Sequence, residues 1–77
     1  MSAADDCEEL VEAMAESAHN AWWSTYKKLG YTSRLAAWGE EFMVPYCDLS
    51  ERGKEFDRII MRAILDTMGR KGYRVQN

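Results

Sequence analysis

The chain has 77 residues, of which 47% are hydrophobic and 30% charged, a composition typical of one small globular domain. Its formal net charge of -3 argues against a general nucleic-acid binder, which normally carries a basic surplus. No apolar run approaches the roughly 20 residues that span a bilayer, and the acidic start does not resemble a secretory signal. Two cysteines are too few for a disulfide framework. We therefore expect a cytoplasmic protein in which Cys7 and Cys47 are free thiols.

The charge is unevenly distributed along the chain. Residues 1–29 hold six acidic and two basic side chains, whereas residues 51–77 hold four acidic and seven basic ones. Either the two ends form helices that attract each other when packed, or the last third carries an anion site. We favour the first interpretation, because charge runs are usually solvated faces.

The first predicted element is an amphipathic helix over about residues 4–29, where apolar residues recur at three- and four-residue steps. Lys27 and Lys28 lie in its last turn, where cations are favoured. Gly30 is a natural left-handed terminator, so Tyr31 should fold back onto the helix.

The middle of the chain is predicted to be a variable loop with at most a turn or two of helix. Ser33 could cap a short helix that carries Leu35, Trp38 and Phe42 on one side. Residues 43–46 should be extended, because the residue before a proline is pushed out of the helical region.

A second long helix is predicted from the N-cap Ser50 to about residue 70 or 71, with Gly72 as its terminator. Its apolar face is wide, so we expect it to be buried over more than half its girth, with Ile60 and Ile64 in the core beside Trp22 of the first helix. Residues 73–75 suit a short strand that could pair with residues 43–46. The predicted fold class is mostly α: two long helices, a variable middle loop and short extended or β pieces.

Several short motifs occur in a fixed order along the chain, and together they resemble the ryanodine receptor repeat (RyR) domain over about residues 15–76. They are the segments Ala18-His19-Asn20-Ala21-Trp22, Gly30-Tyr31, Val44-Pro45-Tyr46-Cys47-Asp48-Leu49, Glu55-Phe56-Asp57-Arg58 and Gly72-Tyr73-Arg74-Val75. The loop over residues 32–42 is shorter than in the family and lacks its His-Pro stretch. The resemblance implies one domain over residues 1–77, a free-standing bacterial or phage-type copy. It also implies a regulatory, non-catalytic role, with nucleotide-derived molecules as suspected ligands.

A nucleotide-derived ligand needs a flat aromatic partner for its base and a fixed cation for its phosphate. Tyr31 and Trp38 are the candidate stacking residues, because they lie in or beside the variable loop. Lys54 and Arg58 are the candidate cations, at the start of the second long helix, where backbone N–H groups also favour anions.

Other interpretations of these side chains stay open. His19 and Trp23 complete the candidate site, although His19 is also well placed for a structural hydrogen bond. Asp57 could hold Arg58 in a purely structural pair. Trp38 could simply cap the small core, and Trp23 could make an oligomer contact.

The leading functional hypothesis is a non-catalytic domain that binds or sequesters a nucleotide-derived signal. The alternative is a protein-interaction module that docks through exposed Trp23 and Trp38. A single histidine without a nucleophile and an orienting partner does not support a catalytic triad, and His19 and Cys7 are too far apart on one helix to share a metal ion. We expect no cofactor and no nucleic-acid or membrane partner. The wide apolar face of the second helix favours a homo-oligomer.

Overall fold

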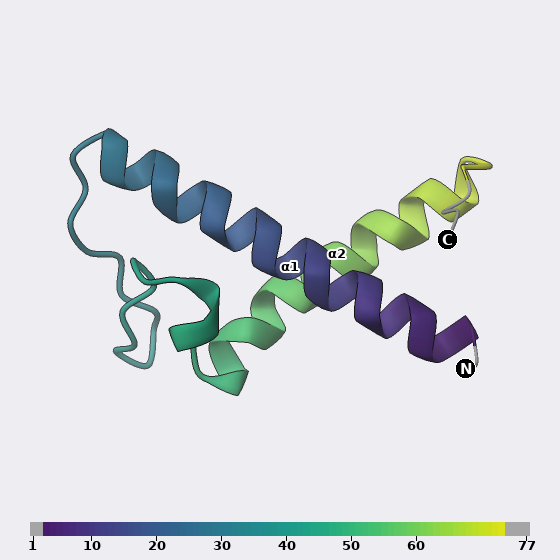
Figure 1. Cartoon of the computed structure of the whole chain (residues 1–77), viewed down its shortest axis with the longest axis horizontal. Coiled ribbons are helices and arrows are strands. Elements are labelled where there is room, and N and C mark those ends of the chain that lie inside the picture. The colour runs from purple at the N-terminus through teal and green to yellow at the C-terminus, as the bar shows by residue number, and fades with distance from the viewer. Residues whose placement is uncertain (1–2, 74–77) are drawn as a thin grey trace.

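Two long helices that cross each other dominate the fold (Figure 1). The computed structural model describes residues 3–73, and it describes their side chains from Glu8 onward. Helix α1 spans Ala3–Lys28 and helix α2 spans Glu51–Arg70, and the 3-10 helix η1 at Tyr46–Asp48 interrupts the connection between them. The prediction of a mostly α fold is confirmed. Over the described residues, neither helix combines the length and apolarity needed to cross a membrane.

The C-terminal end of α1 has the predicted structure. Lys27 and Lys28 lie in its last turn, and Gly30 follows with a φ of 95°, in the left-handed region that favours glycine. The Tyr31 N–H donates to the Tyr26 carbonyl at 3.1 Å, and the centroids of the two tyrosine rings lie 4.9 Å apart. Tyr31 therefore folds back onto the helix, as expected.

Both predicted ends of α2 are also confirmed. The Ser50 side chain accepts a hydrogen bond from the Gly53 N–H at 3.1 Å, which satisfies one of the free donors of the first turn. At the other end Gly72 has a φ of 86°, and the Tyr73 N–H donates to the Met68 carbonyl at 2.9 Å. This is the hydrogen bond of a glycine-terminated helix end.

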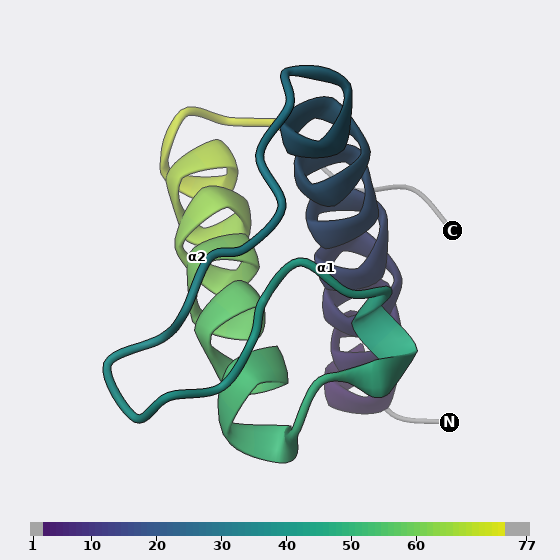
Figure 2. The same ribbon diagram turned by 90° about the vertical axis from the view of Figure 1, so that its left-hand side faces the viewer.

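The loop forms a tight hairpin in place of the short helix that Ser33 could have capped. Leu35 and Glu41 make an isolated antiparallel bridge, and Gly39 reverses the chain with a φ of 88°. Ser33 caps no helix, because its hydroxyl donates to the Glu41 carboxylate at 2.5 Å. The hairpin then crosses in front of the paired helices on its way to η1 (Figure 2). Most of the predicted strand at residues 73–75 lies outside the described residues.

The core is small and lies where α1, α2 and η1 meet. Its buried members are Val11 and Ala15 of α1, Tyr46 and Leu49 beside η1, and Met61 of α2. The buried strip of α2 therefore runs through Met61 and not through the predicted pair of isoleucines.

The predicted burial of Ile60 and Ile64 is wrong, since these side chains are 53% and 42% exposed. Trp22 is half-buried at the edge of the core. The expectation that α2 is buried over more than half its girth is wrong for the same reason: within α2 only Gly53 and Met61 are buried.

Ion pairs between the helices accompany this orientation of α2. Arg58 Nε lies 2.6 Å from Glu12 Oε2, and Arg62 Nη2 lies 3.0 Å from Glu8 Oε2. The arginine side of α2 thus faces α1, and part of the apolar face lies outside. The predicted attraction between the acidic and basic ends of the chain is thus confirmed. Within α2, Asp66 Oδ2 lies 2.6 Å from Arg70 Nη1.

Candidate functional site

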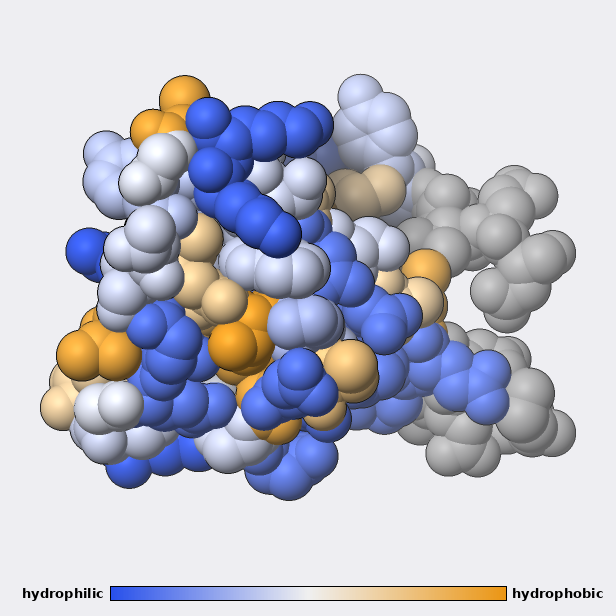
Figure 3. Space-filling view, turned by 60° about the vertical axis from the view of Figure 1, so that its left-hand side comes forward, coloured by the Kyte–Doolittle hydropathy of each residue, from blue (hydrophilic) through white to orange (hydrophobic). Residues whose placement is uncertain are grey.

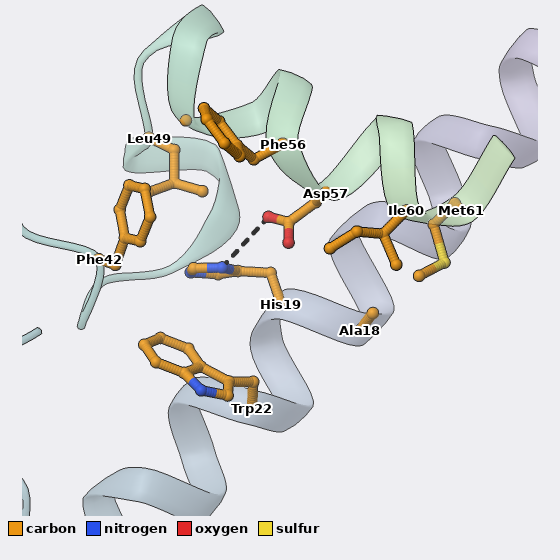
Figure 4. Close-up of a pocket in the computed structure, with 10 residues that line it drawn as sticks. Ala18, His19, Trp22, Phe42, Leu49, Phe56, Asp57, Ile60 and Met61 are labelled. Carbon is orange, nitrogen blue, oxygen red and sulfur yellow. Dashed lines mark ion pairs between the residues drawn. The ribbon is translucent and has the colours of Figure 1, made fainter. Parts of the chain in front are cut away.

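An open cleft of about 340 Å³ lies between α1, α2 and the loop (Figure 4). Its walls are mostly apolar and include three aromatic rings, and its polar side chains are one histidine and one aspartate. The lining residues are Ala18, His19, Trp22, Phe42, Leu49, Gly53, Phe56, Asp57, Ile60 and Met61. A concave, apolar hollow of this size with a few polar groups is typical of a small-molecule site.

His19 is the polar anchor of the cleft and is only 5% exposed. Its Nε2 lies 2.8 Å from the Val44 carbonyl, and its Nδ1 lies 3.4 Å from Asp57 Oδ2. If Nε2–H donates to the Val44 carbonyl, a neutral imidazole leaves Nδ1 as an acceptor facing the Asp57 carboxylate, which is also an acceptor. The contact between Nδ1 and Oδ2 is therefore attractive only when one of these two atoms carries a proton. One histidine thereby ties the loop and both helices together, and the prediction of a structural hydrogen bond at His19 is confirmed.

Asp57 points into the cleft from α2 (Figure 4). Burial raises the pKa of its carboxyl group, and the nearby His19 opposes that rise. The suggestion that Asp57 holds Arg58 is wrong, since its partner is His19. No group of the described residues donates a hydrogen bond to Oδ1, so this oxygen can accept one from a ligand.

Trp38 does not line the cleft but lies behind Phe56, one of its lining residues. Its ring stacks on Phe56 with 5.3 Å between centroids and meets Phe42 edge-on at 5.8 Å. The Arg52 guanidinium covers Trp38 at 4.1 Å from the ring centroid. Trp38 is therefore half-buried, which contradicts the prediction of an exposed docking tryptophan. It supports Phe56, which lines the cleft.

Glu40 is a residue that sequence reasoning missed. Its carboxylate accepts hydrogen bonds from the Ser50 N–H at 2.8 Å, the Ser50 hydroxyl at 2.6 Å and Trp38 Nε1 at 2.8 Å. The Ser50 N–H is the main cause of the lowered pKa of Glu40. The start of α2, predicted to attract a ligand anion, is thus occupied by a carboxylate of the chain itself.

The two predicted cations are held by carboxylates. Arg58 contacts Glu12, Glu51 and Glu55 at 2.6, 2.9 and 3.7 Å, and the hydrogen bond to Glu12 is the main cause of its raised pKa. Lys54 Nζ lies 3.9 Å from Glu51, and 5.5 Å above the centroid of the Tyr46 ring. Neither cation lines the cleft.

Trp23 and Tyr31 meet in a different place. They line a second hollow of about 290 Å³ together with Lys27, Thr32 and Met43. Lys27 Nζ lies 5.4 Å from the centroid of the Trp23 ring, which is half-buried and not exposed as predicted. The six predicted site residues are therefore dispersed, and His19 is the one that lines the main cleft.

A signal in the sequence could have located the cleft. Asp57 is a lone carboxylate flanked by Phe56, Ile60 and Met61 on the apolar side of a helix, and such a residue needs a partner. His19 is the single histidine and a natural candidate for it. Nothing in the sequence indicates that the loop brings Phe42 to the cleft beside His19 and Asp57.

The two remaining predictions about chemistry concern thiols and metals. Cys47 is a free, exposed thiol, as predicted, whereas the side chain of Cys7 lies outside the described ones. Among the described residues, no three histidine, cysteine or acidic side chains are grouped so that they could hold a metal ion.

The family model of the RyR domain matches residues 1–77, the whole length of the chain. No curated protein matches the chain.

Proposed function

The chain belongs to the RyR domain family, and from that premise we propose that it is a non-catalytic recognition domain that binds a nucleotide-derived molecule in the cleft between α1 and α2. One observation carries this proposal: three aromatic rings converge on one open cleft with Asp57 Oδ1, an oxygen to which no group of the described residues donates. Its volume, about 340 Å³, suits a ligand of the size of a nucleobase with its sugar.

The aromatic side chains of the cleft can stack on the flat base of such a ligand. Trp22 enters from α1, Phe42 from the loop and Phe56 from α2, so the rings come from three segments of the chain (Figure 4). A base stacked on one aromatic side chain is stabilised by about 1–3 kcal/mol. Trp38 holds Phe56 in place from behind, so this wall is formed before the ligand arrives.

Asp57 accounts for selection among flat ligands. Its Oδ1 is an acceptor at the polar side of the cleft, so it favours bases that present amino N–H donors, as adenine, guanine and cytosine do. His19 keeps the carboxylate oriented through Oδ2.

Among the residues that the structure describes, none in the cleft is a dedicated partner for the phosphate of such a ligand. Arg58 and Lys54 are engaged by carboxylates, and Glu40 occupies the start of α2. The base therefore supplies most of the affinity, and a nucleoside should bind within a few-fold of its phosphorylated forms.

The absence of catalysis is also part of the proposal. A histidine oriented by an aspartate is the base half of a hydrolytic triad, but none of the ten residues that line the cleft carries a hydroxyl or thiol nucleophile. Both ring nitrogens of His19 are engaged by Val44 and Asp57.

Calorimetry with purine and pyrimidine nucleosides and nucleotides tests the proposal. Trp22→Leu should weaken binding of a purine nucleoside about tenfold or more, because one stacking face is lost. Trp23→Leu is the matched control, since this neighbouring tryptophan lines the other hollow. Equal effects of the two substitutions, or no heat with any ligand, would refute binding in the cleft.

A second candidate function is protein interaction, and a specific observation favours it. Phe56, Ile59 and Ile60 of α2 are each slightly more than half exposed, and Ile64 is 42% exposed. Apolar groups clustered on one side of a helix typically mark a docking surface. This candidate predicts binding of a macromolecule and no affinity for nucleosides.

A further inference from the structure

The side of α2 that turns away from α1 carries a continuous apolar surface. It consists of Phe56, Ile59, Ile60, Ala63, Ile64, Thr67 and Met68, which follow each other at three- and four-residue steps. We call these residues the α2 face. No ribbon of the described residues covers the corresponding side of α2 along its C-terminal half (Figure 2). Apolar side chains also interrupt the hydrophilic surface in the space-filling view (Figure 3).

We propose that the α2 face docks against the same face of a second copy of this chain, in an antiparallel pair around a two-fold axis. This inference does not depend on the ligand of the cleft. It rests on the shape of the face, on the charges along its edge and on its area.

The shape of the face is complementary to itself. A shallow hollow of about 450 Å³ surrounds Ala63, which is exposed and lacks a large side chain. Phe56 stands two helical turns earlier on the same face, and the stacked Trp38 ring fixes its position. In a two-fold pair, each contact between two different residues occurs twice. Phe56 of each copy can then fill the hollow at Ala63 of the other.

The charges along one edge of the α2 face fit the same alignment of the two helices, in which Phe56 of one copy lies opposite Ala63 of the other. Phe56 and Ala63 are seven positions apart, so an antiparallel pair that matches them places Arg52 of one copy opposite residues 66–67 of the other. Arg52 and Asp66 lie on the same flank of α2 at helical spacing. Among the described side chains, no carboxylate lies within ion-pair distance of Arg52. Asp66 Oδ2 holds Arg70 of the same helix at 2.6 Å, but no described group donates to Oδ1, so Asp66 of the second copy can also take Arg52.

Other charges on α2 are neutralised within the chain. Arg58 and Arg62 face Glu12 and Glu8 of α1, on the opposite side of α2. The face itself presents no net charge, so a strongly acidic or basic partner would gain little from it. An apolar surface of matching shape is the better occupant.

The area of the face indicates a weak, concentration-dependent dimer. Half of a large apolar side chain amounts to roughly 80 Å², so the four exposed large residues contribute on the order of 300 Å² per copy. With the smaller neighbours and both copies counted, the buried area comes close to the roughly 1,000 Å² that a specific interface needs.

Sedimentation equilibrium of the full chain tests the proposal. We expect the mean mass to rise from that of one chain toward twice that value as the concentration approaches about 1 mM, where even a millimolar dissociation constant populates a dimer. Ala63→Glu should abolish the rise, because it places a charge in the hollow. Ala21→Glu is the matched control, since Ala21 is exposed on α1, and it should leave the dimer unchanged. Circular dichroism checks that both variants keep their helices, and Ile59→Lys is a second variant of the face.

Charge exchange tests the register. Arg52→Glu and Asp66→Arg should each weaken the dimer several-fold, and the double variant should restore it, since the pair is re-formed across the two-fold axis. A chain that stays monomeric at about 1 mM overturns the proposal. A dimer that survives Ala63→Glu places the interface elsewhere and overturns it too. If the parent chain dimerises but the double variant does not regain dimerisation, the proposed pairing of Arg52 with Asp66 of the second copy is refuted. Phe56 and Ile60 belong both to the α2 face and to the cleft, but these measurements use no nucleoside, so their outcomes do not decide whether the cleft binds one.

Discussion

Arg58 of α2 contacts Glu12 of α1 with Nε 2.6 Å from Oε2, and the two residues lie 46 positions apart in the chain. The same carboxylate accepts the Tyr46 hydroxyl at 2.9 Å. Glu12 thus joins α1 to α2 and to η1. The hydrogen bond from Arg58 is the main cause of the lowered pKa of Glu12. This contact fits the observed orientation of α2, in which Met61 packs into the core.

Removing the arginine should therefore destabilise the fold. Arg58→Met keeps much of the aliphatic stem but removes the two hydrogen bonds that the guanidinium donates to Glu12. Because Glu12 is partly exposed, we expect a loss of about 1–2 kcal/mol in the free energy of unfolding, measured by urea titration. Arg70→Met is the control, since its pair with Asp66 is exposed, and it should have little effect. Equal losses in both variants would contradict the central role of Arg58.

Tyr46 should make the protein sensitive to alkali. Burial is the main cause that raises the pKa of its hydroxyl to about 12, and the hydrogen bond to Glu12 adds to it. The folded state therefore keeps this proton above pH 10, where the unfolded chain loses it. Stability from this group is complete below about pH 10 and is lost as the pH rises toward 12, by roughly 2 kcal/mol. In urea titrations across this range, Tyr46→Phe should show a shallower decline than the parent. Parallel curves would mean that Tyr46 does not hold its proton.

Two neighbouring residues of α2 should differ sharply on truncation. Met61→Ala empties part of the core and should cost about 2–4 kcal/mol. Ile60→Ala removes a side chain that is 53% exposed, so it should cost about 1 kcal/mol or less. Urea titration at micromolar concentration, where the chain is expected to be monomeric, compares the two. A larger loss at Ile60 would show that the helix is rotated from its described orientation.

The two glycines inside α2 offer another matched pair. A Cβ at Gly53 would lie 3.2 Å from a Glu40 carboxylate oxygen and 3.3 Å from the Phe42 ring, whereas a Cβ at Gly69 would meet nothing within 4 Å. Glu40 is held by Ser50 and cannot move freely. Gly69→Ala should raise stability by about 0.5–1 kcal/mol, as expected for alanine in a helix. Gly53→Ala should lower the melting temperature relative to Gly69→Ala, because the loop must shift. If both substitutions stabilise equally, the loop does not pack on Gly53.

The buried pair of His19 and Asp57 should show strong coupling. His19→Leu leaves the Val44 carbonyl and the Asp57 carboxylate without a partner and should cost about 2–3 kcal/mol. Adding Asp57→Leu removes the unpaired carboxylate, so the double variant should be more stable than His19→Leu alone. A double-mutant cycle by thermal or urea unfolding measures this coupling. Simple additivity would show that the two side chains do not interact.

The sequence by itself determined the local structure. Ser50, Gly30 and Gly72 mark helix ends through their own hydrogen-bonding capacity or backbone freedom, so both helices could be placed to within a residue or two. The attraction between an acidic α1 and a basic α2 was also predictable, because it follows from composition along the chain. The ordered motifs likewise identified the family, because each motif is a short run of neighbouring residues whose order does not depend on how the chain folds.

Tertiary structure decided which side of each element is used. A wide apolar face does not specify which of its residues faces the partner helix, and only the packing of α2 against α1 and η1, together with the long-range pair of Arg58 and Glu12, shows that Met61 is inside and Ile60 outside. The loop likewise had no periodic pattern, so only its folded path reveals that Glu40 caps α2 and that Phe42 joins the cleft. Contacts between residues far apart in the chain depend on the relative position of both helices, and local propensity carries no information about that position.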